Sequence, residues 1–157
     1  MKKYKIFFIT ILMIIITSCG FNIVEHSDRS TFDIAEIKTS GNNKINYKIK
    51  NKILFGSSKN DKKLISLNLD SKKSKSVKEK NIKNEITKYQ IKIEINIEVY
   101  EINNSKKIFF RVVRAGDYDV ASQYSQTLNN EKKLVNFLID NISEQILDEL
   151  TVRLNAL

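Results

Sequence analysis

The sequence lacks most of the residues from which enzyme and metal sites are commonly built. Its 157 residues include one cysteine, Cys19, one histidine, His26, and no tryptophan or proline. A single cysteine cannot form an internal disulfide or a multi-cysteine zinc site, and a single histidine gives no basis for a catalytic triad or a His-rich metal site. The four glycines never have the spacing of a nucleotide-binding loop. The composition therefore predicts a protein that is not an enzyme and holds no metal or cofactor.

The remaining basis for an enzyme is the carboxylates. Asp148 and Glu149 are adjacent in a predicted helix, where neighbouring side chains point about 100° apart and cannot hold a substrate or a metal between them. Asp117 and Asp119 lie in a polar, glycine-containing segment, and we expect them to form a turn. Neither pair favours catalysis.

Residues 1–18 have the pattern of a signal peptide. Three lysines precede an apolar run over residues 6–17, which is shorter than the roughly 20 residues that a membrane-spanning helix needs. The run ends in Ile16-Thr17-Ser18-Cys19, which resembles a bacterial lipobox, because small side chains admit the peptidase and the thiol accepts a diacylglyceryl group. We therefore predict that Cys19 carries a covalent diacylglycerol and an acyl chain. The alternative is an unmodified cysteine after a simple secretion signal.

The period of the apolar residues predicts six elements in the rest of the chain. They are a β-like segment over residues 32–38, a helix over 44–55 stopped by Gly56, strands over 64–69, 89–100 and 108–114, and a long last helix that is capped by Asn129 or Asn130. The order β-α-β-β-β-α can bury its helix stripes only against the apolar face of one sheet. We therefore predict an α+β two-layer sandwich, in which a mostly antiparallel four-stranded sheet is covered by two helices.

Three parts of the chain follow from this division: a signal peptide over residues 1–18, a lipidated tether over 19–31 and one α+β domain over 32–157. Within the domain, 57–62 is predicted as a loop and 103–105 as a hairpin turn. The Lys/Ser/Asn-rich run over 70–85 is predicted as a long mobile loop or a loosely paired strand extension. Glu131 is predicted to lie in the first turn of the last helix, where the helix dipole favours an anion.

The positive charge is unevenly distributed. The whole chain has a formal net charge of +9, whereas residues 44–114 alone hold 19 basic and 7 acidic side chains. Such a surface attracts anions, whether phosphorylated lipid, nucleic acid or an acidic protein. Only four of the basic residues are arginines, which disfavours sequence-specific nucleic-acid recognition. Because an exported lipoprotein does not normally meet nucleic acid, we expect an anionic lipid or glycolipid as the ligand.

Several features together resemble the LPS-assembly lipoprotein family, LptE. They are the lipobox followed by Gly20-Phe21, the element order with its long C-terminal helix, the segment Thr87-Lys88-Tyr89-Gln90-Ile91, Arg114-Ala115, the segment Ser122-Gln123-Tyr124-Ser125, and Asn130-Glu131 leading into the helix. The resemblance covers about 130 residues. Glycine after the lipidated cysteine is similar to the outer-membrane sorting pattern of lipoproteins.

The resemblance implies a role without catalysis. Members of the family are outer-membrane lipoproteins that plug the lumen of the β-barrel LptD, support its assembly and help to pass lipopolysaccharide to the cell surface. It also implies that basic residues contact the phosphates of lipid A, and by position these are Lys80, Lys83, Lys88 and Arg111. The domain would face the periplasm or the barrel lumen. The alternative that the residues leave open is a lipoprotein that binds anionic lipid or another envelope component without a barrel partner.

Overall fold

The computed structural model of the chain describes residues 32–56, 63–102 and 106–156. The elements are β1 (Phe32–Gly41), α2 (Asn43–Gly56), β2 (Lys63–Lys80), β3 (Ile86–Glu101), β4 (Lys106–Asp119) and α3 (Tyr124–Asn155). This order confirms the predicted β-α-β-β-β-α arrangement and the α+β class. The predicted signal peptide, Cys19, the tether over 19–31, the loop over 57–62 and the turn over 103–105 lie outside the described residues.

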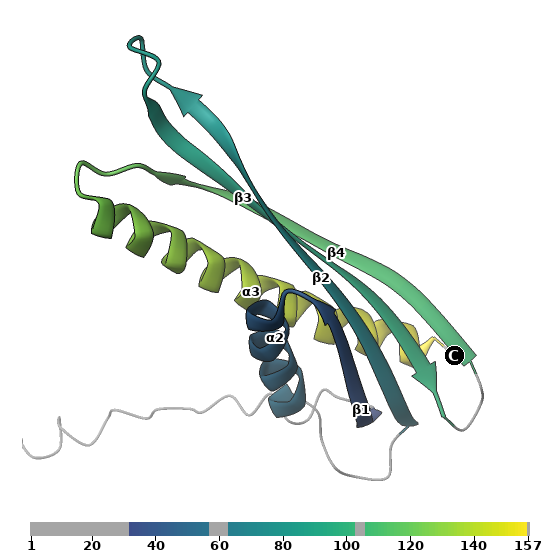
Figure 1. The fold of residues 1–157 in the computed structure, drawn as a ribbon. Helices are drawn as coiled ribbons and strands as arrows, with labels where there is room; N and C mark the ends of the chain where they lie inside the picture. The colour runs from purple at the N-terminus through teal and green to yellow at the C-terminus, as the bar shows by residue number, and fades with distance from the viewer. Residues whose placement is uncertain (1–31, 57–62, 103–105, 157) are drawn as a thin grey trace, which may run out of the picture.

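The four strands form one sheet in the order β1-β2-β3-β4. β1 pairs with β2 in parallel, and the other two pairs are antiparallel. Both helices cover the same face of this sheet, and α2 connects the two parallel strands (Figure 1). The predicted mostly antiparallel sheet covered by two helices is therefore confirmed.

Alternation along β3 explains why only one face is covered. Ile91, Ile93, Ile95, Ile97 and Val99 are at most 1% exposed and point to the helices. The residues between them are polar, and on the opposite face they pair with charged neighbours, as in the Lys107–Glu98 pair at 3.3 Å. A strand in which apolar and polar residues alternate buries one face and leaves the other in contact with water.

The short helix α2 follows directly from its sequence. Ile45, Ile49 and Ile53 recur every fourth residue and are at most 2% exposed, so one stripe of the helix faces the core. The side-chain oxygen of Asn42 accepts a hydrogen bond from the Ile45 N–H at 3.1 Å. Asn42 therefore caps the helix.

The long helix α3 begins at Tyr124, five residues before the predicted cap at Asn129. The prediction of its start was wrong because no side-chain cap marks it. Instead, the buried Thr127 hydroxyl bonds to the backbone N–H and carbonyl of Ala121, which fixes the chain as it enters the helix. Glu131 consequently lies about two turns inside the helix, and its predicted place in the first turn was also wrong.

Two strands are longer than predicted. β2 continues to Lys80, so the run after Asp70 is the strand extension and not the mobile loop. β4 continues to Asp119, and within this extension Asp117 lies opposite Gln90 of β3. The prediction that Asp117 and Asp119 form a turn was therefore wrong. In both cases pairing with β3 holds polar residues in a strand that their own composition does not favour.

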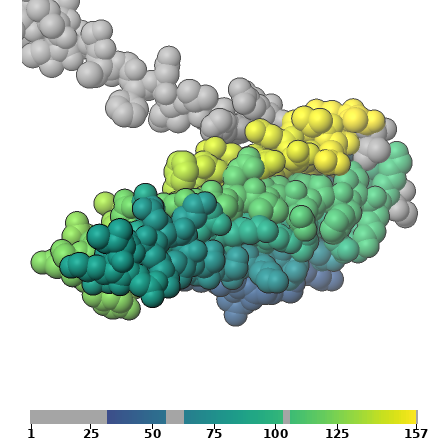
Figure 2. Space-filling view, turned by 90° about the horizontal axis from the view of Figure 1, so that it is seen from above, coloured from purple at the N-terminus to yellow at the C-terminus, as the bar shows by residue number. Residues whose placement is uncertain are grey.

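The domain is elongated and has two distinct ends (Figure 2). One end, which we call the hairpin end, holds the β2–β3 turn, the end of β4 and the start of α3. The other, the Phe32 end, holds the starts of β1 and β2 and the end of α3, where the Lys63 ammonium donates to the Leu154 carbonyl. α2 starts beside Ser71 in the middle of the sheet and runs toward the Phe32 end (Figure 1).

Candidate functional site

The β2–β3 hairpin projects past the rest of the sheet (Figure 1). At the base of this projection, the Val120 N–H donates a hydrogen bond to the Thr87 carbonyl at 2.9 Å. Beyond it, Asn81 closes the turn, because its side-chain oxygen accepts hydrogen bonds from the N–H groups of Lys83 and Glu85. Asn84 adopts the left-handed conformation, with φ 64°, which asparagine tolerates better than most residues. The tip is thus an ordered ribbon.

This tip brings together three of the four predicted lipid-contacting residues. Lys80 ends β2, Lys83 lies in the turn and Lys88 pairs across from Glu79. Among the described residues, Lys80 contacts only the neutral Asn84 side chain, at 3.0 Å, and Lys83 makes no ion pair. These two ammonium groups remain available to an external anion.

Lys88 is partly neutralised by its own surroundings. Its ammonium lies 3.0 Å from a Glu79 carboxylate oxygen and 4.0 Å from one of Asp119. The hydrogen bond with Glu79 is the main cause that raises the pKa of Lys88. Lys88 therefore contributes less free charge than Lys80 or Lys83.

The fourth predicted residue, Arg111, is not part of this group. It lies opposite Asn96 on the open face of the sheet, eight residues of β3 away from Lys88, which is about 26 Å at the rise of a strand. Its guanidinium pairs with Glu94 at 3.1 Å. The structure therefore separates Arg111 from the three lysines of the hairpin.

A cluster that the sequence analysis missed lies beneath the hairpin end, between β2 and α3. Glu131 of α3 accepts from Lys73 at 2.7 Å, from Lys75 at 2.9 Å and from the Tyr118 hydroxyl at 2.9 Å. The Lys75 ammonium also lies 4.2 Å from the centre of the Tyr89 ring, a favourable cation–π distance. We call these five residues the Glu131 cluster.

The Glu131 side chain is only 20% exposed, so its charge depends on ion pairs and hydrogen bonds for stabilisation. The hydrogen bond from Lys73, with further ones from Lys75 and Tyr118, lowers the pKa of Glu131 to about 2. Burial by itself would lower the pKa of Lys75, but its hydrogen bonds with Tyr118 and Glu131 outweigh burial and raise it. Burial is also the main cause that raises the pKa of Tyr118. Through the ion pairs of Lys73 and Lys75 with Glu131, the cluster connects the C-terminal half of β2 to α3.

One signal for this cluster was present in the sequence. Lys73 and Lys75 continue the inward period of Leu67 and Leu69 along β2, so a strand over 70–80 would have placed them toward α3. Which carboxylate they meet depends on where α3 begins, and its start was predicted incorrectly.

The described part of the chain offers little for other chemistry. Among residues 32–56, 63–102 and 106–156, no three side chains of the metal-binding types come together. Neither α2 nor α3 has a stretch long and apolar enough to cross a bilayer.

The fold belongs to a class that is found among bacterial lipoproteins. The rare lipoprotein B from Shewanella oneidensis has 12% identity to this chain and a TM-score of 0.50, over 77% of this chain and 94% of that one. The uncharacterized lipoprotein B from Nitrosomonas europaea has 10% identity and a TM-score of 0.55, over 80% of this chain and 86% of that one. A candidate lipoprotein from Caulobacter crescentus has 13% identity and a TM-score of 0.53, over 76% and 90%.

No protein-family model and no curated protein matches the sequence. At these low identities the structural likeness establishes the fold.

Proposed function

We propose that the chain is an outer-membrane lipoprotein of the LptE type. It is anchored through acylated Cys19, plugs the β-barrel LptD, helps that barrel to assemble and assists the transport of lipopolysaccharide by binding lipid A phosphates. Three observations support the proposal: the lipobox, the fold shared with bacterial lipoproteins and the basic hairpin end. No catalytic step is part of it.

The observation that carries the proposal is the projecting hairpin with its free lysines. Lys80 and Lys83 extend from an ordered ribbon past the sheet, where no carboxylate among the described residues pairs with them. A lipid A phosphate is a dense anion, for which an ammonium group is an effective point-charge ligand. The exposed Ile82 side chain between them adds an apolar contact for a lipid.

The combined variant Lys80→Ala, Lys83→Ala and Lys88→Ala is expected to weaken lipopolysaccharide binding. We expect a loss of about ten-fold at low ionic strength, because exposed charge pairs are individually weak, and a smaller loss as salt screens the charges. Fluorescence titration of the purified protein with lipopolysaccharide at several salt concentrations measures this. The control removes Lys92 and Lys106, which lie away from the tip. Equal binding by the triple variant and the native protein at every salt concentration would refute the site.

The partner is tested by purification of a C-terminally tagged copy from native envelopes in mild detergent. The proposal expects one large β-barrel protein at about one-to-one stoichiometry, together with an acylated Cys19 peptide. A matched Cys19→Ser copy should lose both the acyl mass and the membrane fraction. Recovery of the acylated protein alone would favour the alternative, a lipoprotein that binds envelope lipid without a barrel.

A further inference from the structure

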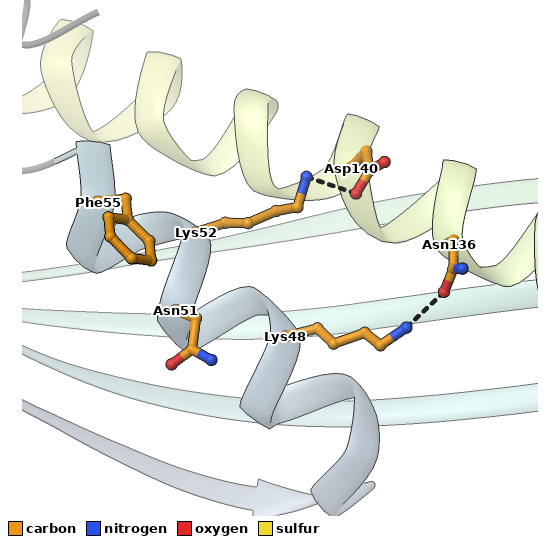
Figure 3. Close-up of a pocket in the computed structure, with 6 residues that line it drawn as sticks. All are labelled: Lys48, Asn51, Lys52, Phe55, Asn136 and Asp140. Atoms are coloured by element: carbon orange, nitrogen blue, oxygen red, sulfur yellow. Dashed lines mark hydrogen bonds and ion pairs between the residues drawn. The ribbon is translucent and has the colours of Figure 1, made fainter.

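A groove between α2 and α3 lies on the helix-covered side of the molecule, away from the tip of the hairpin. One residue stripe of each helix lines it: Lys44, Lys48 and Lys52 of α2, and Lys132, Asn136 and Asp140 of α3, which form three pairs whose members are 88 positions apart in the sequence. Two of these pairs are bonded across the groove: Lys48 donates to the Asn136 side chain, and Lys52 forms an ion pair with Asp140 (Figure 3). The Lys48–Asn136 bond separates an outer hollow from an inner one.

The third pair, Lys44 and Lys132, consists of two residues of like charge. Lys44 and Lys132 both line the inner hollow, and neither makes an ion pair within the described part of the chain. Lys48, which also lines it, contacts only a neutral amide. The one carboxylate of the hollow, Glu131, is already held by Lys73 and Lys75. Besides Lys73, which pairs with Glu131, three lysines therefore line a hollow that offers them no free carboxylate among the described residues.

The size and lining of the groove suit an amphiphile. The inner hollow has a volume of about 270 Å³ and an apolar floor that includes Ile45, Val135 and Ile139. The outer hollow has about 450 Å³ and ends at Phe55, whose side chain is 90% exposed at the end of α2 (Figure 3). Its other lining residues are polar or charged, so its apolar surface comes from Phe55 and from the carbon stems of side chains such as Lys48 and Lys52. Such a groove accommodates one phosphate headgroup and an adjoining apolar segment.

The position of the groove brings it within reach of a membrane. α2 runs toward the Phe32 end (Figure 1). Phe55 is the last residue but one of this helix, and Phe32, which begins β1, is where the sequence from Cys19 joins the described domain. The segment from Cys19 to Phe32 spans at most about 45 Å when fully extended. An acylated Cys19 would therefore keep this end close to a bilayer surface.

We propose that the α2–α3 groove binds an anionic glycerophospholipid, with its phosphate between Lys44, Lys48 and Lys132 and its acyl chains directed past Phe55. The phosphate supplies the counter-charge that the facing lysines lack, and Phe55 covers the apolar part. The location rests on the proposed anchor at Cys19, whereas the binding itself does not. The site adds a lipid contact that orients the domain on its membrane.

The test uses the mature chain, residues 19–157, with Cys19→Ser, so that acyl chains contribute nothing. Its partition onto vesicles of phosphatidylethanolamine is compared with that onto vesicles that also contain phosphatidylglycerol. The variant Lys44→Ala, Lys48→Ala and Lys132→Ala changes exposed or half-buried helix positions where alanine is favourable. We expect it to bind the phosphatidylglycerol vesicles about a hundred-fold more weakly, since each lysine near an anionic surface contributes about a five-fold factor. Phe55→Ser should weaken binding to both kinds of vesicle.

The matched control has the same net charge. The hairpin variant Lys80→Ala, Lys83→Ala and Lys88→Ala should keep phosphatidylglycerol binding and bind lipopolysaccharide about ten-fold more weakly at low ionic strength. The groove variant should keep lipopolysaccharide binding and bind phosphatidylglycerol vesicles more weakly. Equal vesicle binding by the groove variant and the native chain, equal loss by both variants, or a groove variant that loses only lipopolysaccharide would each overturn the groove site. A hairpin variant that still binds lipopolysaccharide would refute the proposed function and leave the groove site standing.

Discussion

Glu131→Gln is expected to destabilise the folded protein by about 2 kcal/mol at neutral pH. The substitution removes the carboxylate that pairs with both Lys73 and Lys75, whose side chains are 27% and 39% exposed. Loss of one partner from a fully buried ion pair costs about 3–5 kcal/mol, and the partial exposure of this cluster reduces that figure. Urea denaturation followed by circular dichroism measures the free energy of unfolding. Glu144→Gln, an exposed position of the same helix, is the control and should change it little.

The same cluster predicts how stability depends on pH. The pKa of Glu131 is lowered from 4.5 to about 2 in the folded protein, so the folded state holds the charged form more strongly than the unfolded state does. Its contribution is therefore complete above pH 4.5 and is lost as the pH falls toward 2. The native protein should lose stability through this window, while Glu131→Gln should lose less of it. Parallel acid-denaturation curves for the two proteins would contradict the role of Glu131.

Gly41→Ala is expected to destabilise the protein more than Glu131→Gln does. Gly41 has φ +86°, and an added Cβ would lie 2.0 Å from the backbone carbonyl oxygen of Ser71. The neighbouring Asn42 N–H donates to that same oxygen, so the strands cannot move apart without losing the bond. We expect a destabilisation of about 3 kcal/mol and a fall in Tm of about 10 °C.

Gly116→Ala provides the matched comparison. The Cβ at this position would meet the end of the Leu134 side chain at 2.7 Å, and a side chain can rotate away where a backbone carbonyl cannot. We expect about 1 kcal/mol of destabilisation, within the usual range for a tight core contact. Thermal unfolding of both variants decides the point. A Gly41→Ala protein as stable as Gly116→Ala would show that the close approach of β1 to β2 is not rigid.

The regular elements were predictable because their apolar residues have a clear period. The alternation from Ile91 to Val99 and the four-residue steps of Ile45, Ile49 and Ile53 each specify one buried face. These patterns are local, so the strand β3, the helix α2 and their order could be predicted without tertiary information. The same holds for the apolar stripe of α3, from Leu138 to Leu154.

The polar extensions were not predictable in this way. Residues 72–80 of β2 carry few apolar side chains, and composition alone suggested a loop as readily as a strand. Pairing with β3 along this stretch supplies the backbone hydrogen bonds that decide for a strand. Asp117 and Asp119 became strand residues for the same reason. Pairing with the long strand β3 therefore outweighed the low strand propensity of these residues.

For the candidate sites, too, the sequence could predict some features, and others depend on the tertiary structure. The family resemblance named Lys80, Lys83, Lys88 and Arg111 as candidates, and the structure brings the first three together at the β2–β3 hairpin. The sequence did not predict this hairpin. It could not show that Arg111 lies about 26 Å away, because that depends on the register of β4 against β3. Nor could the sequence show that Lys44 and Lys132 line the same groove, because that depends on how α2 packs on α3.

The sequence by itself determined the α+β class, the order of elements, the buried stripes and the net positive charge of the middle of the chain. Periodicity and composition are local properties, and each of these features depends only on them. The tertiary structure alone decided where the strands end, which charges are neutralised and which remain free. Those outcomes depend on contacts between residues far apart in the sequence, such as Glu131 with Lys73 and Lys75. The energies of such contacts cannot be predicted from a local sequence pattern.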